Sequence, residues 1–106
     1  MQANIRNNGY SLFLKPDEVN RIGKDSSLQA RLYDETSNRL DTGKSLHLGL
    51  GGNKEGIDAR LKYSQRERNK LYITVTKAGK RKLLAGEPVL AKYALGTITV
   101  QVELRS

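Results

Sequence analysis

Apolar and polar residues alternate along most of the chain with a period of two. This pattern is typical of strands that bury one face, because successive side chains of a strand point to opposite sides. It predicts strands within the ranges 28–33, 45–50, 57–63, 70–76 and 97–104. The last is the most regular, since Ile98, Val100 and Val102 alternate with polar residues and β-branched side chains favour strands.

One short helix is predicted near residues 16–22. Pro16 suits a first helical position, and Gly23 favours an end to the helix. Val19 and Ile22 are three apart and would pack on the sheet, while Leu12 and Leu14 form the preceding strand.

Other segments give weaker patterns. The range 83–95 permits either a helical turn or a covering loop, because Pro88 disfavours a continuous helix. Both termini are expected to be loose, and the glycine-rich range 49–56 is expected to be a flexible hairpin connection, in preference to a ligand loop. No internal repeat is evident.

Short strands, frequent turns and one helix indicate a mainly β protein. At 106 residues the chain has room for one domain, residues 1–106, with a single core. We expect a small antiparallel barrel or sandwich. The arrangement resembles the five-stranded oligonucleotide-binding barrel in architecture only, because no family motif matches residues of this chain.

Positive charge is concentrated in one stretch. Residues 60–82 hold nine basic residues and one acid, Glu67, so this segment alone carries the formal net charge of +8 of the whole protein. Solubility does not require charges of one sign on a single segment. Their mutual repulsion also destabilises the compact state. A polyanionic partner explains the placement, and a lysine-rich hairpin without a partner is the alternative.

The basic stretch is predicted to form a two-stranded ribbon over residues 57–82. Outward cations on paired strands lie within about 5 Å of one another or roughly twice that distance on the diagonal, which suits a phosphate backbone. A flexible Gly79 would let the following cations close around a bound strand. The predicted nucleic-acid-binding residues are Arg60, Lys62, Arg66, Arg68, Lys70, Tyr72, Lys77, Lys80, Arg81 and Lys82.

Exposed aromatic rings would favour single strands over duplex, because unpaired bases stack on them. Phe13, Tyr33 and Tyr72 are predicted to point outward, with packing inside the sheet as the alternative for each. A helix suited to the major groove is not evident.

The residue types give no sign of an enzyme. The chain has no Cys, and its one histidine, His47, is expected to be a plain surface residue, so neither a metal nor another cofactor is predicted. The sequence Gly43-Lys44-Ser45 lacks the earlier glycine and the helix of a phosphate-binding loop. No secretory signal or membrane span is expected, which indicates a cytoplasmic or virion-associated protein.

These features predict a non-enzymatic protein that binds single-stranded DNA or RNA in a sequence-tolerant, backbone-driven manner. The alternative is a phage-type inhibitor or virion module whose basic ribbon docks on an acidic protein. A third option is a structural subunit that assembles through an unpaired edge at the strand ending in Leu104. Homodimerisation suits all three.

Overall fold

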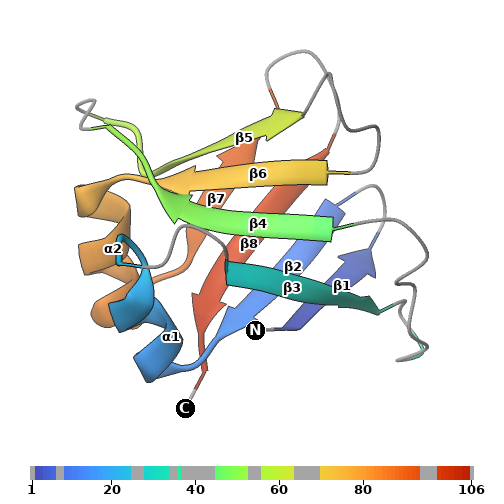
Figure 1. Cartoon of the computed structure of the whole chain (residues 1–106), viewed down its shortest axis with the longest axis horizontal. Coiled ribbons are helices and arrows are strands. Elements are labelled where there is room, and N and C mark those ends of the chain that lie inside the picture. Colours follow the sequence, from blue (N-terminus) through green and yellow to red (C-terminus); the bar gives the residue numbers. More distant parts are fainter. Residues whose placement is uncertain are drawn as a thin grey trace.

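A computed structural model shows a compact β protein with two short helices (Figure 1). It describes residues 2–6, 9–24, 28–33, 36, 45–52, 56–63, 70–93 and 98–105. The strands are β1 Gln2–Arg6, β2 Gly9–Leu14, β3 Leu28–Tyr33, β4 Ser45–Leu50, β5 Ala59–Tyr63, β6 Lys70–Val75, β7 Val89–Lys92 and β8 Thr99–Leu104. The helices are α1 Pro16–Arg21 and α2 Lys77–Leu84.

The described strands follow one order, β5-β6-β4-β3-β1-β2-β8-β7. Two four-stranded sheets, β5-β6-β4-β3 and β1-β2-β8-β7, meet where β1 pairs with β3. The β1–β3, β2–β8 and β4–β6 pairs are parallel, so the predicted antiparallel arrangement holds only for the other pairs. The terminal strands β5 and β7 contact each other, but no ladder joins the described parts of them into a closed barrel.

The core follows the predicted alternation. Leu12 and Leu14 of β2, Ile73 of β6, and Val100 and Val102 of β8 are fully buried. The two helices lie side by side at one end of the strands, where Val19, Ile22 and Leu83 close the core (Figure 1). Burial of these apolar side chains is the main force that stabilises the fold.

The termini differ from the sequence prediction. Residues 2–6, predicted to be loose, form the inner strand β1 between β2 and β3. The strand β8, predicted to offer an unpaired edge, lies between β2 and β7, so the edge expected there does not exist. Ala3 of β1 is buried in the core and pairs with Leu12 of β2, but its small side chain gives little hydrophobic signal in the sequence.

The connections around β4 and β7 also differ. β4 pairs with β6 and not with β5, so residues 51–56 do not join a hairpin as predicted. The ambiguous range 83–95 contains the strand β7, which pairs with β8 and begins directly after Pro88. A proline outside the strand removes no ladder hydrogen bond, so its presence is compatible with the strand that follows.

The fold repeats itself, which the sequence did not reveal. The first repeat is the β1–β2 hairpin, α1 and the β3–β4 hairpin, and the second is the β5–β6 hairpin, α2 and the β7–β8 hairpin. Each sheet contains one hairpin from each repeat, joined by the parallel pairs β2–β8 and β4–β6.

The registers of the two repeats correspond residue by residue. The β1–β2 partners Ala3 and Leu12 match Leu61 and Ile73 of β5–β6. In the same way the β3–β4 partners Leu28 and Leu48 match Val89 and Val102 of β7–β8. Apart from Ala30 and Ala91, the corresponding core positions of these strands share apolar character and not residue identity, which is why the repeat is not visible in the letters of the sequence.

Candidate nucleic-acid interface

A basic and aromatic surface forms on the outer side of the sheet β5-β6-β4-β3. Arg60 and Lys62 of β5 and Tyr72 of β6 are exposed, and the residues between them are buried. The register sets Lys62 beside Tyr72 and Arg60 beside Thr74. We call Arg60, Lys62, Lys70 and Tyr72 the basic face. β5 and β6 pair antiparallel as predicted for the ribbon, whereas residues 77–82, which the prediction included in the ribbon, lie in α2.

Tyr72 rests on His47. The two ring centroids lie 5.0 Å apart with an interplanar angle of 21°, which is a stacked arrangement. His47 is only 8% exposed, so the prediction of a plain surface histidine is wrong, whereas Tyr72 remains 37% exposed. One ring face of Tyr72 is thus held by His47, and an exposed part of the side chain is left for a ligand.

Four further predicted cations lie on α2, at the end of the molecule: Lys77, Lys80, Arg81 and Lys82. Gly79 lies inside this helix, so a flexible connection that closes around a ligand is wrong. Thr76 caps α2, because its hydroxyl accepts a hydrogen bond from the Gly79 amide. Gly79 itself is buried, and a Cβ there would collide with the carbonyl oxygen of Asp58.

Two of the α2 cations have partners within the protein. The Lys80 ammonium donates to the carbonyl oxygen of Ile22 at 2.7 Å, which ties α2 to the end of α1. The Lys82 ammonium lies 2.7 Å from the Asp58 carboxylate. This hydrogen bond, together with the charge of Asp58, raises the pKa of Lys82 above its ordinary value. Lys77 and Arg81 are exposed.

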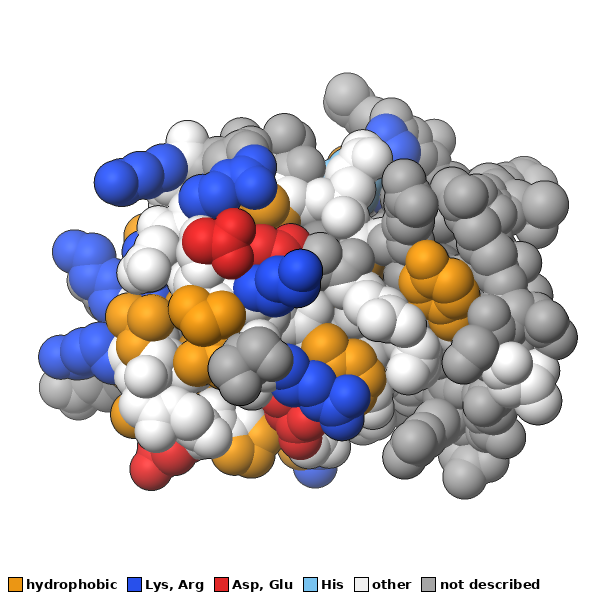
Figure 2. Space-filling view, turned by 90° about the horizontal axis from the view of Figure 1, so that it is seen from below, with side chains coloured by type: hydrophobic (Ala, Val, Ile, Leu, Met, Phe, Trp, Pro, Cys, Tyr) orange, Lys and Arg blue, Asp and Glu red, His pale blue; other side chains and the backbone are white. Residues whose placement is uncertain are grey.

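The surface at the helical end is mixed in charge. Figure 2 shows basic side chains gathered there among acidic and hydrophobic ones. The surface around the described α2 cations is therefore less uniform in charge than the basic face. Arg66 and Arg68, which were predicted at the tip of the ribbon, lie outside the described residues.

The other predicted stacking rings do not join the basic face directly. Phe13 of β2 belongs to the opposite sheet, and the Arg105 guanidinium carbon lies 3.7 Å from its ring centroid. Such a cation–π contact already covers one face of the ring. Tyr33 is half-buried at the end of β3.

The repeat provides an internal comparison for the basic face. The strands β3, β4, β5 and β6 contain four basic residues and no acidic ones, whereas β1, β2, β7 and β8 contain two basic residues and one acid. By register, the counterparts of Arg60, Lys62, Tyr72 and His47 are Gln2, Asn4, Ser11 and Gln101. The same backbone is thus built with neutral polar residues, so the fold does not require the basic face.

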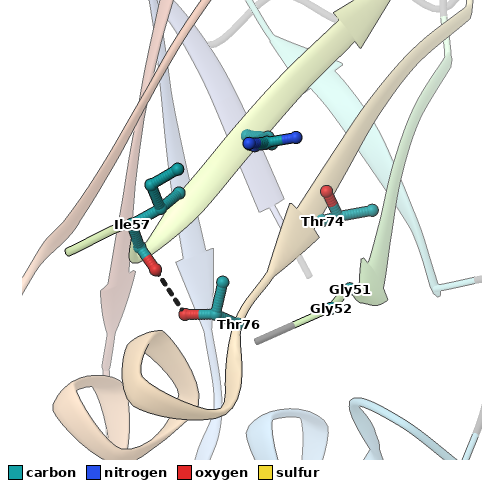
Figure 3. A pocket seen from close by; sticks show the side chains of 6 residues that line it. Gly51, Gly52, Ile57, Thr74 and Thr76 are labelled. Atoms are coloured by element: carbon teal, nitrogen blue, oxygen red, sulfur yellow. Dashed lines mark hydrogen bonds between the residues drawn. The ribbon is translucent and has the colours of Figure 1, made fainter. Parts of the chain in front are cut away.

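A hollow opens beside the basic face, where β5 begins and β6 ends (Figure 3). Its volume is about 220 Å³, and it is lined by Gly51, Gly52, Ile57, Arg60, Thr74 and Thr76. The Thr76 hydroxyl donates to the carbonyl oxygen of Ile57 at 2.7 Å, which fixes one wall. Sequence reasoning missed this hollow because it treated the glycines as a turn. It missed the His47–Tyr72 stack because it placed His47 at the surface.

Comparison of the chain with models of protein families, with curated protein sequences and with solved structures finds no match. Within the described ranges, no cluster of three or more side chains is suited to hold a metal ion. The helices in these ranges are also too short and too polar to cross a bilayer. The geometry of the surface is therefore the basis for assigning a function.

Proposed function

We propose that the protein binds nucleic acid without catalysis, with single-stranded DNA or RNA preferred over duplex, through the basic face. The observation that carries this proposal is the exposed Tyr72, backed by His47 and flanked by Lys62. The neutral counterparts of these residues in the other repeat support a role in binding rather than in folding.

The chemistry of the basic face suits a single strand. Cations neutralise phosphates and release their counterions, whatever the base sequence. A ring that is fixed on one side offers its exposed surface to an unpaired base, and stacking of this kind contributes about 1–3 kcal/mol per base. In a duplex the bases are already stacked on one another, so Tyr72 would add less to its binding.

The test is a fluorescence anisotropy titration of the full chain. Labelled single-stranded and duplex oligonucleotides of equal length are compared at several salt concentrations. We expect tighter binding of the single strand and a linear fall of log affinity with log salt. Binding of neither at low salt would reject the proposal and favour an acidic protein as the partner of the same face.

Lys62→Gln and Lys15→Gln form a matched pair for this titration. Lys62 lies on the basic face, whereas Lys15 is exposed beyond the end of β2 in the other sheet. If Lys62 contacts a phosphate, its loss should reduce the salt slope on single strands by about 0.7. Equal effects of the two variants would show that only overall charge matters, and would contradict a localised face.

We also propose that the strands close into a barrel through β5 and β7, which contact each other. The corresponding strands β1 and β3 pair in parallel, with Gln2 opposite Arg31. The equivalent register would set Arg60 opposite Lys92 and extend the basic face. Cross-strand nuclear Overhauser effects between β5 and β7 would support this closure, and their absence would favour two open sheets.

A further inference from the structure

The hollow beside Arg60 has a filled counterpart in the sheet β1-β2-β8-β7. The Gly51 amide donates to the Val75 carbonyl at 2.9 Å, and the Arg105 amide donates to the Leu14 carbonyl at 2.7 Å. Val75 and Leu14 are themselves equivalent, because each ends the strand before a helix and pairs with the last residue of β4 or β8. Gly51 therefore occupies the place of Arg105.

The two places differ in what covers the sheet. In the sheet β1-β2-β8-β7, the guanidinium carbon of Arg105 lies 3.7 Å from the ring centroid of Phe13. In the sheet β5-β6-β4-β3, Thr74 stands in the register position of Phe13, and Gly51 has no side chain. The small residues Thr74 and Gly51 thus take the places of the large residues Phe13 and Arg105. The hollow of about 220 Å³ lies beside the small residues.

The lining favours a neutral planar group over a phosphate. Two of the donors that could hold an anion are already used, since the Gly51 amide bonds Val75 and the Thr76 hydroxyl bonds Ile57. Among the described residues that line the hollow, Arg60 is the one with a charge. The other described walls are glycine backbone, two threonines and the apolar Ile57.

The size of the hollow sets a limit on the ligand. It is smaller than the pockets of drug-sized molecules, which measure about 300–1,000 Å³. A single ring system fits this description better than a whole nucleotide. The arginine fork adds a chemical preference, because it matches the O6 and N7 acceptors of guanine with two parallel hydrogen bonds.

We propose that the hollow takes one base of the bound strand, with guanine preferred through Arg60. This inference rests on the proposed function and adds a base preference to binding that is otherwise independent of sequence. Thr74 follows Tyr72 by two residues on the outer side of β6, so a base stacked on Tyr72 and a base in the hollow are neighbours.

The experiment compares labelled oligothymidine strands that carry one central guanine, adenine or cytosine. The full-length protein should bind the guanine strand about tenfold more tightly than the others, as expected of one bidentate arginine contact. Thr74→Phe installs the residue of the first repeat and should reduce the guanine preference to within about twofold. Gln101→Phe adds the same ring to the opposite sheet and should leave the preference intact.

Arg60→Lys provides a second variant that keeps the charge and removes the fork. It should also abolish the preference, and circular dichroism would verify that each variant is folded. If the wild-type protein binds all strands equally, or if Arg60→Lys keeps the guanine preference, the inference is wrong although the proposed function stands. If no strand binds, the proposed function itself fails.

Discussion

Gly79 allows α2 to pack closely against Asp58, because glycine has no side chain. Glycine within a helix costs about 0.5–1 kcal/mol relative to alanine, yet a Cβ at this position would meet the carbonyl oxygen of Asp58. We expect Gly79→Ala to lower the free energy of unfolding by about 2 kcal/mol, as overpacking of a close contact does. Urea denaturation measures this change.

Ala78→Gly is the matched control for that substitution. It changes helix propensity in the same turn and should cost about 1 kcal/mol without a new contact. If Gly79→Ala instead stabilised the protein, helix propensity would dominate and the close approach of Asp58 would not constrain α2.

The ion pair of Lys82 and Asp58 predicts a dependence of stability on pH. Asp58 raises the pKa of Lys82 above the ordinary value of 10.5. The stabilisation is therefore fully present below that ordinary value and is lost as the pH rises through the raised pKa. Because the ammonium is exposed, the effect is small and falls with added salt.

Thermal melts at a series of pH values test this expectation. Lys82→Gln should melt below the wild-type protein at neutral pH, and the difference should vanish in strong alkali. Lys77→Gln removes an exposed cation from the same helix that has no acidic partner among the described residues. If the two variants had the same melting temperature at every pH, the ion pair would contribute nothing to stability.

At the scale of strands and helices, alternation predicted most of the strands but not their partners. The buried and exposed residues of β6 and β8 follow the sequence pattern. β1 and β7 were missed because they are short, and because Ala3 and Ala91 fill their core positions with little apolar surface. Parallel pairing depends on contacts between residues far apart in the chain, which a local pattern does not contain.

The same limit applies to the candidate site. The sequence placed Arg60, Lys62 and Tyr72 on one outer face, as the structure has them. It could not show that Lys80 and Lys82 have partners, because Ile22 and Asp58 are distant in sequence. The charge of a residue can be read from its letter, whereas its contacts require the fold.

The pairing of β6 with β4 sets the Tyr72 ring beside His47, and the contribution of this ring to binding can be tested separately. Tyr72→Leu should weaken single-strand binding by about 1–3 kcal/mol and duplex binding less, because only unpaired bases stack on the ring. Tyr72→Phe keeps the ring and should bind almost as the wild type does. Equal losses for single strand and duplex would assign the ring to packing against His47 alone.

At the scale of the whole molecule, the repeat makes each half dependent on the other. The β1–β2 hairpin needs β8 as its neighbour, and the β5–β6 hairpin needs β4. Each half alone would therefore expose one edge of each of its two hairpins and the apolar faces of both. The two hairpins of residues 1–53 would still pair through β1 and β3, but their apolar faces would lack the strands of the second half that cover them.

This dependence predicts the behaviour of the chain divided into residues 1–53 and 54–106. Each fragment alone should lack a cooperative melting transition, and an equimolar mixture should regain it as a one-to-one complex. Circular dichroism and size-exclusion chromatography with light scattering measure both outcomes. A folded homodimer of one fragment would agree with the argument, since a second copy could supply the missing hairpins. A fragment that folds as a monomer would contradict this dependence, because that fragment would then be stable without the hairpins of the other repeat.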